Sequence, residues 1–426
     1  MSPPALLLLG VAAFAVFLRG LRLPFPLALA ASAIVIGVAG TLELPLRHLV
    51  EGGFGYLNLM LALFAGAWFG QVARQSGLAD GFANGLLGLT GARPAITLTV
   101  VALPLFAAGM FTGLAGVAVL TVGVFAVPAL RRIGLAAHDT AAFVALVATC
   151  GMIAPPVNLP AMMIADGVNM PFLNFDRTLY LISLPVMAFT VIRYAHRCAA
   201  PRDGFEEQSC ARSGAPPRAA LLGVLPLALT LGFWLVLRLL PGQVFDPGVP
   251  AVLVMVAILM LPLLGRHAII RSAGEALSGT PLYLAAALVA VGMLVQIMTL
   301  TGIRGWLVMQ TMASDAPWLQ LLLFALPVAG GVLTSSGAAN ILGVPFAFAF
   351  INQDMIINVS ALSSIAAISE FMPPTAIGAA LAGYVAREQH LLRIVRSALP
   401  SLALLLAISM ALILYAKPLA RFLTAT

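Results

Sequence analysis

The sequence contains 426 residues, of which 62% are hydrophobic and 9% are charged, and its formal net charge is +7. Soluble domains carry about 25% charged and about 45–50% apolar residues, so this chain has too little polar surface to cover a water-soluble globule. The composition excludes an ordinary soluble enzyme and a nucleic-acid-binding protein. It predicts an all-α polytopic membrane protein whose surroundings are a lipid bilayer.

Apolar stretches long enough to cross a bilayer recur along the chain, since a spanning helix needs about 20 mostly apolar residues. The first stretch lacks the basic front of a signal peptide, so we expect it to be a membrane span. The expected spans of the first half are residues 5–18, 26–42, 57–72, 140–165 and 179–192, and those of the second half are 221–240, 250–264, 281–300, 355–386 and 399–415.

Two charge-free stretches, residues 94–130 and 316–353, are too long for a single span. Each has glycines and small polar residues in its middle. At about 1.5 Å per residue, each can enter and leave the membrane as a re-entrant helical hairpin. Gly-interrupted segments at matching places in two halves are typical of transporter binding sites.

The two stretches belong to an internal repeat. Gly113 lies 42 residues before Pro155, and Gly331 lies 42 residues before Pro373. Such self-similarity predicts two copies of one unit. Five full crossings in each half would make the two copies inverted. The expected first repeat is 1–192, with a hairpin at 94–130 and a broken helix at 140–165, and the second is 219–426, with a hairpin at 316–353 and a broken helix at 355–386.

The positions of the basic residues predict the orientation. Residues 193–218 contain five arginines and form the expected cytoplasmic linker between the repeats, because cytoplasmic loops are enriched in Lys and Arg. Counting spans from this linker places Arg131, Arg271 and Arg387 on the cytoplasmic side. The first hairpin would then enter from the cytoplasm and the second from outside.

Each repeat contains a Pro-Pro pair within an apolar run, Pro155-Pro156 and Pro373-Pro374. Proline lacks an N–H and disrupts the preceding helical turn. We therefore expect broken helices whose free carbonyls and half-helix ends bind ions or substrate. A simple kink is the alternative for one pair, but two pairs in register with two hairpins favour the break.

Small polar residues at the expected hairpin tips are candidate ligands: Thr112, Ser335, Ser336 and Asn340. Their oxygens, together with backbone carbonyls, suit a sodium ion, and Thr112 and Ser335 are the expected metal ligands. The alternative is tight helix packing, in which small residues let backbones approach closely.

Glu370 lies in an otherwise apolar run beside Pro373. A carboxylate near the middle of a bilayer costs at least about 2.5 kcal/mol, and such residues are usually functional. Glu370 could carry a proton, or it could be a structural residue bonded to a helix end or a serine. Asn158, just after the first Pro-Pro pair, is a further candidate. No Walker A motif is present, the cysteines form no metal pattern, and an intramembrane enzyme would need a catalytic His or Asp pair. We expect no enzyme activity and no cofactor beyond a coupling ion.

Several motifs resemble the large membrane subunit of TRAP (tripartite ATP-independent periplasmic) transporters. In the first half they are Ser76-Gly77-Leu78-Ala79-Asp80, Thr112-Gly113, Pro128 and residues 151–156, and in the second half they are residues 331–345 with Pro373-Pro374. The resemblance covers nearly the whole chain.

This resemblance implies a secondary transporter with an elevator motion in the bacterial inner membrane, usually driven by sodium. A small membrane subunit and a periplasmic substrate-binding protein would be its partners, and the substrate would be a small organic acid such as a C4-dicarboxylate. The residues that match the family's tips and breaks are Thr112, Gly113, Pro155, Pro156, Gly331, Ser335, Pro373 and Pro374.

The chain also departs from the family pattern. Leu114 and Ala115 stand where the family usually has Ser-Ser, Ser335 replaces a common acidic residue, and Glu370 occupies a usually apolar position. These differences lead to the hypothesis that protons, through Glu370, replace or join sodium as the coupling ion. The alternative function is a stand-alone carboxylate:cation symporter of the same superfamily, without a binding protein.

Overall fold

In a computed structural model, which describes residues 1–198, 217–240, 242–314 and 323–423, the chain is helical without strands in those ranges. The helices before the first hairpin are α1 (Pro3–Ala15), α2 (Phe25–Thr41), α3 (Leu46–Phe54), α4 (Leu57–Gln75) and α5 (Leu78–Thr90). The remaining helices of the first half are α6 (Pro94–Thr112), α7 (Ala115–Ala118), α8 (Val124–Arg132), α9 (Ala137–Ile153), α10 (Leu159–Gly167) and α11 (Asp176–Ala195), with π turns η1 (Val16–Gly20) and η2 (Val119–Gly123).

The second half repeats this mixture of long and interrupted helices. Its helices are α12 (Pro217–Leu239), α13 (Val249–Met260), α14 (Arg266–Ala276), α15 (Gly279–Leu300), α16 (Ile303–Met312), α18 (Ala325–Ala338), α19 (Val344–Ala349), α20 (Met355–Ala367), α21 (Ile377–Ala386), α22 (Leu391–Leu414) and α23 (Ala416–Leu423). Short turns complete it: η4 (Leu261–Leu263), η5 (Ala339–Gly343) and η6 (Ile368–Phe371). Most of the expected linker and the start of the expected second hairpin lie outside the described residues.

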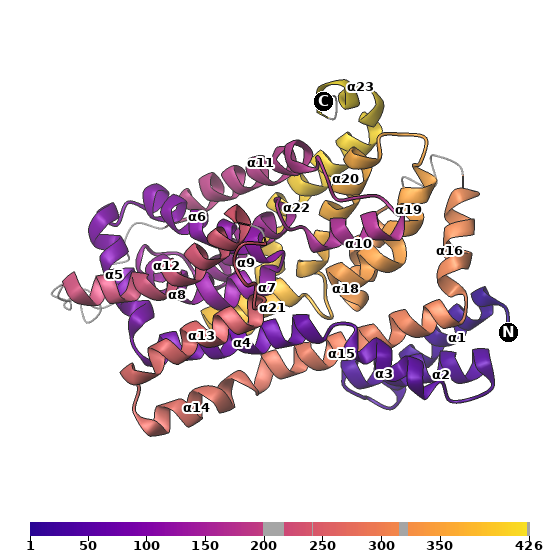
Figure 1. The fold of residues 1–426 in the computed structure, drawn as a ribbon, viewed down its shortest axis with the longest axis horizontal. Coiled ribbons are helices and arrows are strands. Elements are labelled where there is room, and N and C mark those ends of the chain that lie inside the picture. Colours follow the sequence, from indigo (N-terminus) through magenta and orange to yellow (C-terminus); the bar gives the residue numbers. More distant parts are fainter. Residues whose placement is uncertain (199–216, 241, 315–322, 424–426) are drawn as a thin grey trace.

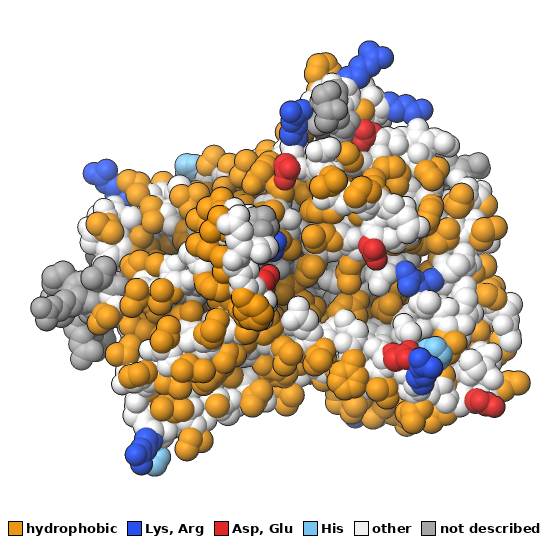
Figure 2. Space-filling view, in the orientation of Figure 1, with side chains coloured by type: hydrophobic (Ala, Val, Ile, Leu, Met, Phe, Trp, Pro, Cys, Tyr) orange, Lys and Arg blue, Asp and Glu red, His pale blue; other side chains and the backbone are white. Residues whose placement is uncertain are grey.

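The described residues contain eight helices long and apolar enough to cross a membrane, or nine if the bent pair α3–α4 is one span. Hydrophobic side chains cover most of the face seen in Figure 2, where charged side chains are few. Because lipid leaves backbone groups without partners, helices are one of the two structures that can span it. The prediction of an all-α polytopic membrane protein is confirmed.

The helices form two groups in Figure 1. Along one side run α4 and α15, with α2 and α3 packed on α15 and α13 packed on α4. On the other side lie the interrupted helices α6–α10 and α18–α21, with α11 and α22. Every residue of α9 from Asp139 to Ile153 is buried, as expected for a helix that is apolar on all faces. The core of the molecule therefore surrounds α9.

Two helices extend further than the apolar stretches indicated. Residues 266–300, comprising α14 and α15, form one candidate span whose first part, α14, contains Arg266, Arg271 and Glu275, although we expected a span only from 281. The helix α22 begins at Leu391, before Arg393 and Arg396, and not at 399. Charged residues at a helix end fit a helix that continues beyond the hydrocarbon layer, so a charge does not mark where helical structure begins.

Both helices with Pro-Pro pairs are interrupted there. The helix α9 ends at Ile153 and α10 begins at Leu159, while η6 ends at Phe371 and α21 begins at Ile377. Both Pro-Pro peptide bonds are cis. The halves pack reciprocally: α9 lies against α21, and α10 lies against α20. The expected unwinding at the two pairs is confirmed.

The interruption of the second long stretch differs from the expected one. In the first, the left-handed residue is Gly113 (φ 67°), as expected. In the second, Gly331 lies within helix α18, and the positive φ (66°) falls on Thr334. A Cβ at residue 331 would lie 2.5 Å from the carbonyl oxygen of Pro373. Glycine at 331 therefore serves close packing against the second helix break, and Thr334 is the true tip.

Candidate functional site

A small cavity lies between the two tips, with a volume of about 40 Å³. The first tip contributes residues 113–117 to its lining, and the second contributes Thr334, Ser335 and Ser336. Glu370 and Ile377 line it from the second broken helix, and leucines of α4 and α15 close the opposite side. A space of this size holds a few water molecules at most.

The first tip is held by Thr112, which is 4% exposed. Its hydroxyl donates to the carbonyl oxygen of Ala108 over 2.7 Å and accepts from the amide of Leu114 over 3.3 Å. Gly113 packs against the first Pro-Pro break, where a Cβ would lie 2.7 Å from a methyl group of Val157. Thr112 therefore fixes the turn, and its hydroxyl is already engaged by the backbone.

The second tip is joined to the second broken helix by a side-chain hydrogen bond. The hydroxyl of Ser335 donates to Oε1 of Glu370 over 2.5 Å. Oε2 of Glu370 has no well-aligned hydrogen-bond partner among the described residues and faces the backbone of Gly378, in the first turn of α21. Glu370 is 5% exposed. It is thus a buried carboxyl group that contacts both the tip and a helix N-terminus.

A second link ties the tip helix to the break through Gly331. The carbonyl oxygen of Gly331 accepts hydrogen bonds from the amide of Thr375 over 3.0 Å and from its hydroxyl over 2.9 Å. Thr375 directly follows the Pro-Pro pair. One of the free backbone groups that the break leaves is therefore satisfied by the hairpin, as buried backbone groups require.

Asn158 holds the first break together. Its Oδ1 accepts from the amide of Ala161 and caps α10, while Nδ2 donates to the carbonyl oxygen of Ile153 at the end of α9, each over 2.9 Å. Nδ2 also donates to the hydroxyl of Ser363 in α20 over 3.2 Å. Asn158 is 1% exposed, so it is a buried clamp between both broken helices.

The structure brings together only part of the set of candidate residues. Gly113, Ser335, Ser336 and Glu370 line the cavity, whereas Thr112 and Asn158 lie beside it within the backbone breaks. Pro156, Pro373 and Pro374 are exposed on the surface of this chain. The lining of the cavity includes no proline of either pair.

Asn340 lies away from the tip cavity. It belongs to the π turn η5, and its Oδ1 accepts a hydrogen bond from Arg304, at the start of α16, over 2.7 Å. A π turn holds one more residue than an α turn and rotates the side chains after it. Asn340 therefore faces α16, and its expected place at the tip is not what the structure shows.

The two expected sodium ligands do not meet in the cavity, because the Thr112 hydroxyl is directed into α6 while Ser335 bonds to Glu370. In the described part of the chain, no cluster of three or more His, Cys, Asp or Glu side chains could hold a metal ion.

A much larger vestibule, about 1200 Å³, opens between α4, α14 and α21. Here Gln71 of α4 donates to the hydroxyl of Tyr384 over 2.5 Å, and Arg74 donates to the carbonyl oxygen of Val385 over 3.0 Å. Sequence reasoning missed these residues, although Gln71 and Arg74 are the first polar groups at the end of an apolar span. The vestibule also contains Arg271 and Arg387, which the charge pattern predicts on the cytoplasmic side.

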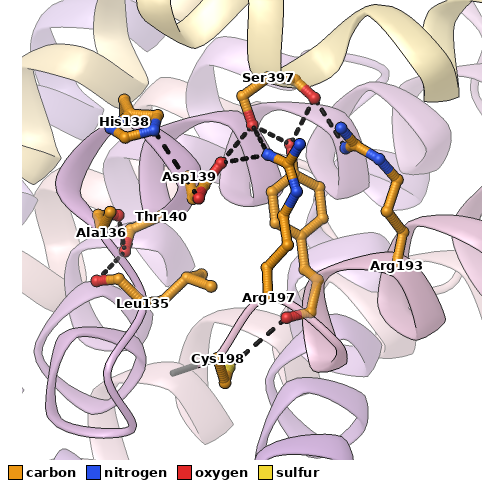
Figure 3. A network of polar contacts seen from close by, with 10 residues as sticks. Leu135, Ala136, His138, Asp139, Thr140, Arg193, Arg197, Cys198 and Ser397 are labelled. Carbon is orange, nitrogen blue, oxygen red and sulfur yellow. Dashed lines mark hydrogen bonds and ion pairs between the residues drawn. The ribbon is translucent and has the colours of Figure 1, made fainter. Parts of the chain in front are cut away.

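A polar network ties the ends of α9, α11 and α22 together (Figure 3). Oδ1 of Asp139 accepts from Arg197 over 2.7 Å and from the Ser397 hydroxyl over 2.5 Å. The Ser397 carbonyl oxygen accepts from Arg193 over 2.7 Å. Asp139 is 8% exposed. The network fixes three helices of the core and was not expected from the sequence.

Within the described residues, these features define a polytopic membrane protein in which two helices are interrupted at Pro-Pro pairs and two tips meet at a small cavity. The family model described as tripartite ATP-independent periplasmic transporter, DctM component, matches residues 10–419. The chain therefore belongs to the family of TRAP transporter large components, as its motifs indicated. No match was found among curated proteins.

Proposed function

We propose that this protein is the permease of a TRAP-type secondary transporter that moves a small organic acid, such as a C4-dicarboxylate, into the cell with a cation gradient. The observation that carries the proposal is the cavity built jointly by both tips and the second break. Irregular backbone at membrane depth is tolerated where it lines a cavity or is buried in protein. Interrupted helices of this kind are typical of substrate sites in secondary transporters.

An acidic substrate is supported by the helix ends at the cavity. Ala115 begins the apolar helical segment that runs to Arg132, and Ile377 begins α21, and both residues line the cavity. Helix N-termini present free N–H groups and a positive dipole end, so they attract carboxylates. No arginine is present among the described residues that line the cavity, so these ends and the serine hydroxyls would carry recognition.

An elevator motion of two inverted repeats is supported by the reciprocal packing of the broken helices, α9 on α21 and α10 on α20. Each half also has a left-handed tip residue followed by a π turn, η2 or η5. We infer that the group containing α4 and α15 is the scaffold and that the interrupted helices move against it. In the inner membrane, a small membrane subunit would cover the scaffold and a periplasmic binding protein would deliver the substrate, as in the family generally.

Reconstitution into proteoliposomes tests this proposal. Uptake of labelled C4-dicarboxylates and other small organic acids would be measured with the chain alone, with a small membrane subunit, and with a binding protein, under sodium or proton gradients. We expect gradient-driven uptake only with the partners. Uptake by the chain alone would instead establish the stand-alone symporter, and the absence of uptake under every gradient would contradict a secondary transporter of such acids.

A matched pair of variants links the uptake to the cavity. Ser335→Ala removes the hydroxyl that joins the second tip to Glu370, whereas Ser409→Ala removes a hydroxyl that bonds within its own helix, to the carbonyl oxygen of Leu405. We expect uptake to fall in the first variant and to stay at the parent level in the second. Equal uptake in both would place the substrate path elsewhere.

A further inference from the structure

Among the described residues that line the cavity, Glu370 alone has an ionisable side chain. Its side chain is almost fully buried, one oxygen accepts from Ser335, and the other lacks a well-aligned partner among the described residues. Buried polar groups are normally hydrogen-bonded, and an exception in a site calls for an explanation. A proton on Oε2 would make the carboxyl group neutral and remove the cost of burying its charge.

In the part of the chain that the structure describes, no charged side chain lies where it could compensate a carboxylate at this position. The elements packed on η6 are α18, α20, α21 and α22. Helices α18 and α20 contain no charged residue, and the one titratable side chain of α21, Tyr384, bonds to Gln71. Arg393 and Arg396 of α22 are exposed, and the two groups beside the carboxyl group, the Ser335 hydroxyl and the Gly378 backbone, are uncharged. An ionised Glu370 would therefore lack a charged partner among the described residues.

The N-terminus of α21 gives the ionised form one source of stabilisation. Glu370 faces the first turn of α21, where the helix dipole favours a negative charge. This end of the helix is also where a substrate carboxylate would bind. An ionised Glu370 would repel that carboxylate and compete with it for the same dipole, whereas a neutral Glu370 would admit it.

We propose that Glu370 is the proton-binding group that couples substrate binding to a proton gradient. The inference rests on the proposed transport function and names its coupling ion. On the external side, a proton from solution forms an O–H bond with Oε2, and the neutral site accepts the anionic substrate. On the cytoplasmic side, this O–H bond breaks, the proton leaves to water, and the returning carboxylate charge disfavours the substrate.

A route for the proton lies along α21. Gly378 carries no side chain, and a Cβ there would lie only 3.1 Å from Oε2. The next residues, Ala379 and Ala380, line the large vestibule. Less than one helical turn of small residues thus separates Oε2 from a space that opens on the predicted cytoplasmic side. In the arrangement seen here the close contact at Gly378 leaves no room for water, so water reaches the carboxyl group from the vestibule only when the tips open and α21 moves away from η6.

The first test compares Glu370→Gln with Glu51→Gln in proteoliposomes containing the complete transporter. Glu51 is an exposed carboxylate paired with Arg47 on α3, and it is not part of the cavity lining. With one proton per substrate, a tenfold proton gradient supports about tenfold accumulation. We expect this accumulation in the parent protein and in Glu51→Gln, and its loss in Glu370→Gln. Substrate affinity should fall as pH rises in the parent and stay constant in Glu370→Gln.

Glu370→Asp is the control for the possibility that Glu370→Gln loses uptake for structural reasons. It keeps a titratable carboxyl group, so its uptake should remain pH-dependent. Uptake that follows sodium alone and ignores the pH gradient in the parent protein would overturn the inference while leaving the proposed transport function intact. Retained pH dependence in Glu370→Gln would also overturn it.

A second measurement needs no substrate. Infrared difference spectra of the purified transporter, recorded between mildly acidic and mildly alkaline pH, report the C=O stretch of protonated carboxylic acids. We expect a pH-dependent acid band in the parent protein that is missing in Glu370→Gln and unchanged in Glu51→Gln. A parent spectrum in which no acid band depends on Glu370 would overturn the proposal, even if no substrate is transported under any gradient.

Discussion

Asn158 and Ser363 join the two broken helices through a hydrogen bond of 3.2 Å from the side-chain amide to the hydroxyl oxygen. The residues lie 205 positions apart in the chain. Because Asn158 also caps α10 and donates to the last turn of α9, a single side chain holds both halves of one break and the helix facing it. The first break is therefore a rigid structure and not a loose loop.

We expect Asn158→Ala to lower the free energy of unfolding by about 2 kcal/mol, since it removes an N-cap and leaves buried groups unpaired. Thermal unfolding in detergent measures the change. Ser360→Ala in α20 is the control, because its hydroxyl bonds only to the carbonyl oxygen of Ile356 in the same helix. Equal melting temperatures for the two variants would show that Asn158 does not act as a clamp.

The breaks themselves could be predicted from sequence because their cause is local. Proline at 155, 156, 373 and 374 removes backbone donors wherever the helix packs, and the structure ends helices there. Because sequence reasoning depends on such local causes, it predicted the tip at Gly113 and missed the tip at Thr334. Glycine 331 is required by contact with the second break, and a sequence does not distinguish a glycine needed for packing from one needed for a turn.

The contacts around the site could not be predicted because they join distant residues. Asn340 seemed suited to the tip by its spacing, but the register after the π turn directs it to Arg304. The bond between Gln71 and Tyr384 links positions 313 residues apart. Glu370 was singled out by its charge alone; its partner Ser335 became evident only when the tip and the second break were placed side by side.

Close packing between α6 and α9 leads to a second prediction. A Cβ at Gly151 would overlap the carbonyl oxygen of Phe106, whereas a Cβ at Gly232 in α12 would have no atom within 4 Å. Overpacking costs about 1–3 kcal/mol, so Gly151→Ala should lower the melting temperature. Gly232→Ala should leave it unchanged or raise it slightly, because alanine favours helix over glycine. Identical melting curves for Gly151→Ala and the parent protein would show that α6 and α9 can move apart at little cost in stability.

The bond between Gln71 and Tyr384 predicts how the vestibule responds to mutation. It joins α4 to α21 in the arrangement seen here. A hydrogen bond contributes about 1 kcal/mol, which corresponds to about a fivefold change in the ratio of the two states that it distinguishes. Tyr384→Phe should therefore lower the ratio of this arrangement to its alternatives by about that factor. The measurement is the rate at which an impermeant maleimide labels Ala380→Cys in the vestibule. Tyr415→Phe, at the exposed end of α22, is the control, and equal rates in all backgrounds would contradict a role for the bond.

The native thiols affect this labelling in a predictable way. Cys150 is 1% exposed, and Cys210 lies outside the described residues. Burial, and secondarily the nearby Asp139 carboxylate, raises the pKa of the Cys198 thiol above its ordinary value. The reactive thiolate of Cys198 is thus scarcer at neutral pH than in a free cysteine. Labelling of Cys198 should be slow at neutral pH and accelerate as pH rises, and fast labelling at neutral pH would contradict this environment.

The network around Asp139 gives the last prediction (Figure 3). Asp139→Asn keeps the shape of the side chain but removes the charge that accepts from Arg197 and from the Ser397 hydroxyl. The side chain of Asp139 is 11% exposed and that of Arg197 is 41% exposed, and the neutral amide oxygen still accepts hydrogen bonds but no longer carries the charge that strengthens them. We therefore expect a loss of about 1 kcal/mol in the free energy of unfolding. Glu51→Gln breaks the exposed Arg47–Glu51 pair and should leave the melting temperature unchanged, because exposed pairs contribute little. Both variants neutralise one carboxylate of an ion pair, so the difference between their melting temperatures measures what the junction of α9, α11 and α22 contributes to stability. Equal melting temperatures would show that this junction is dispensable.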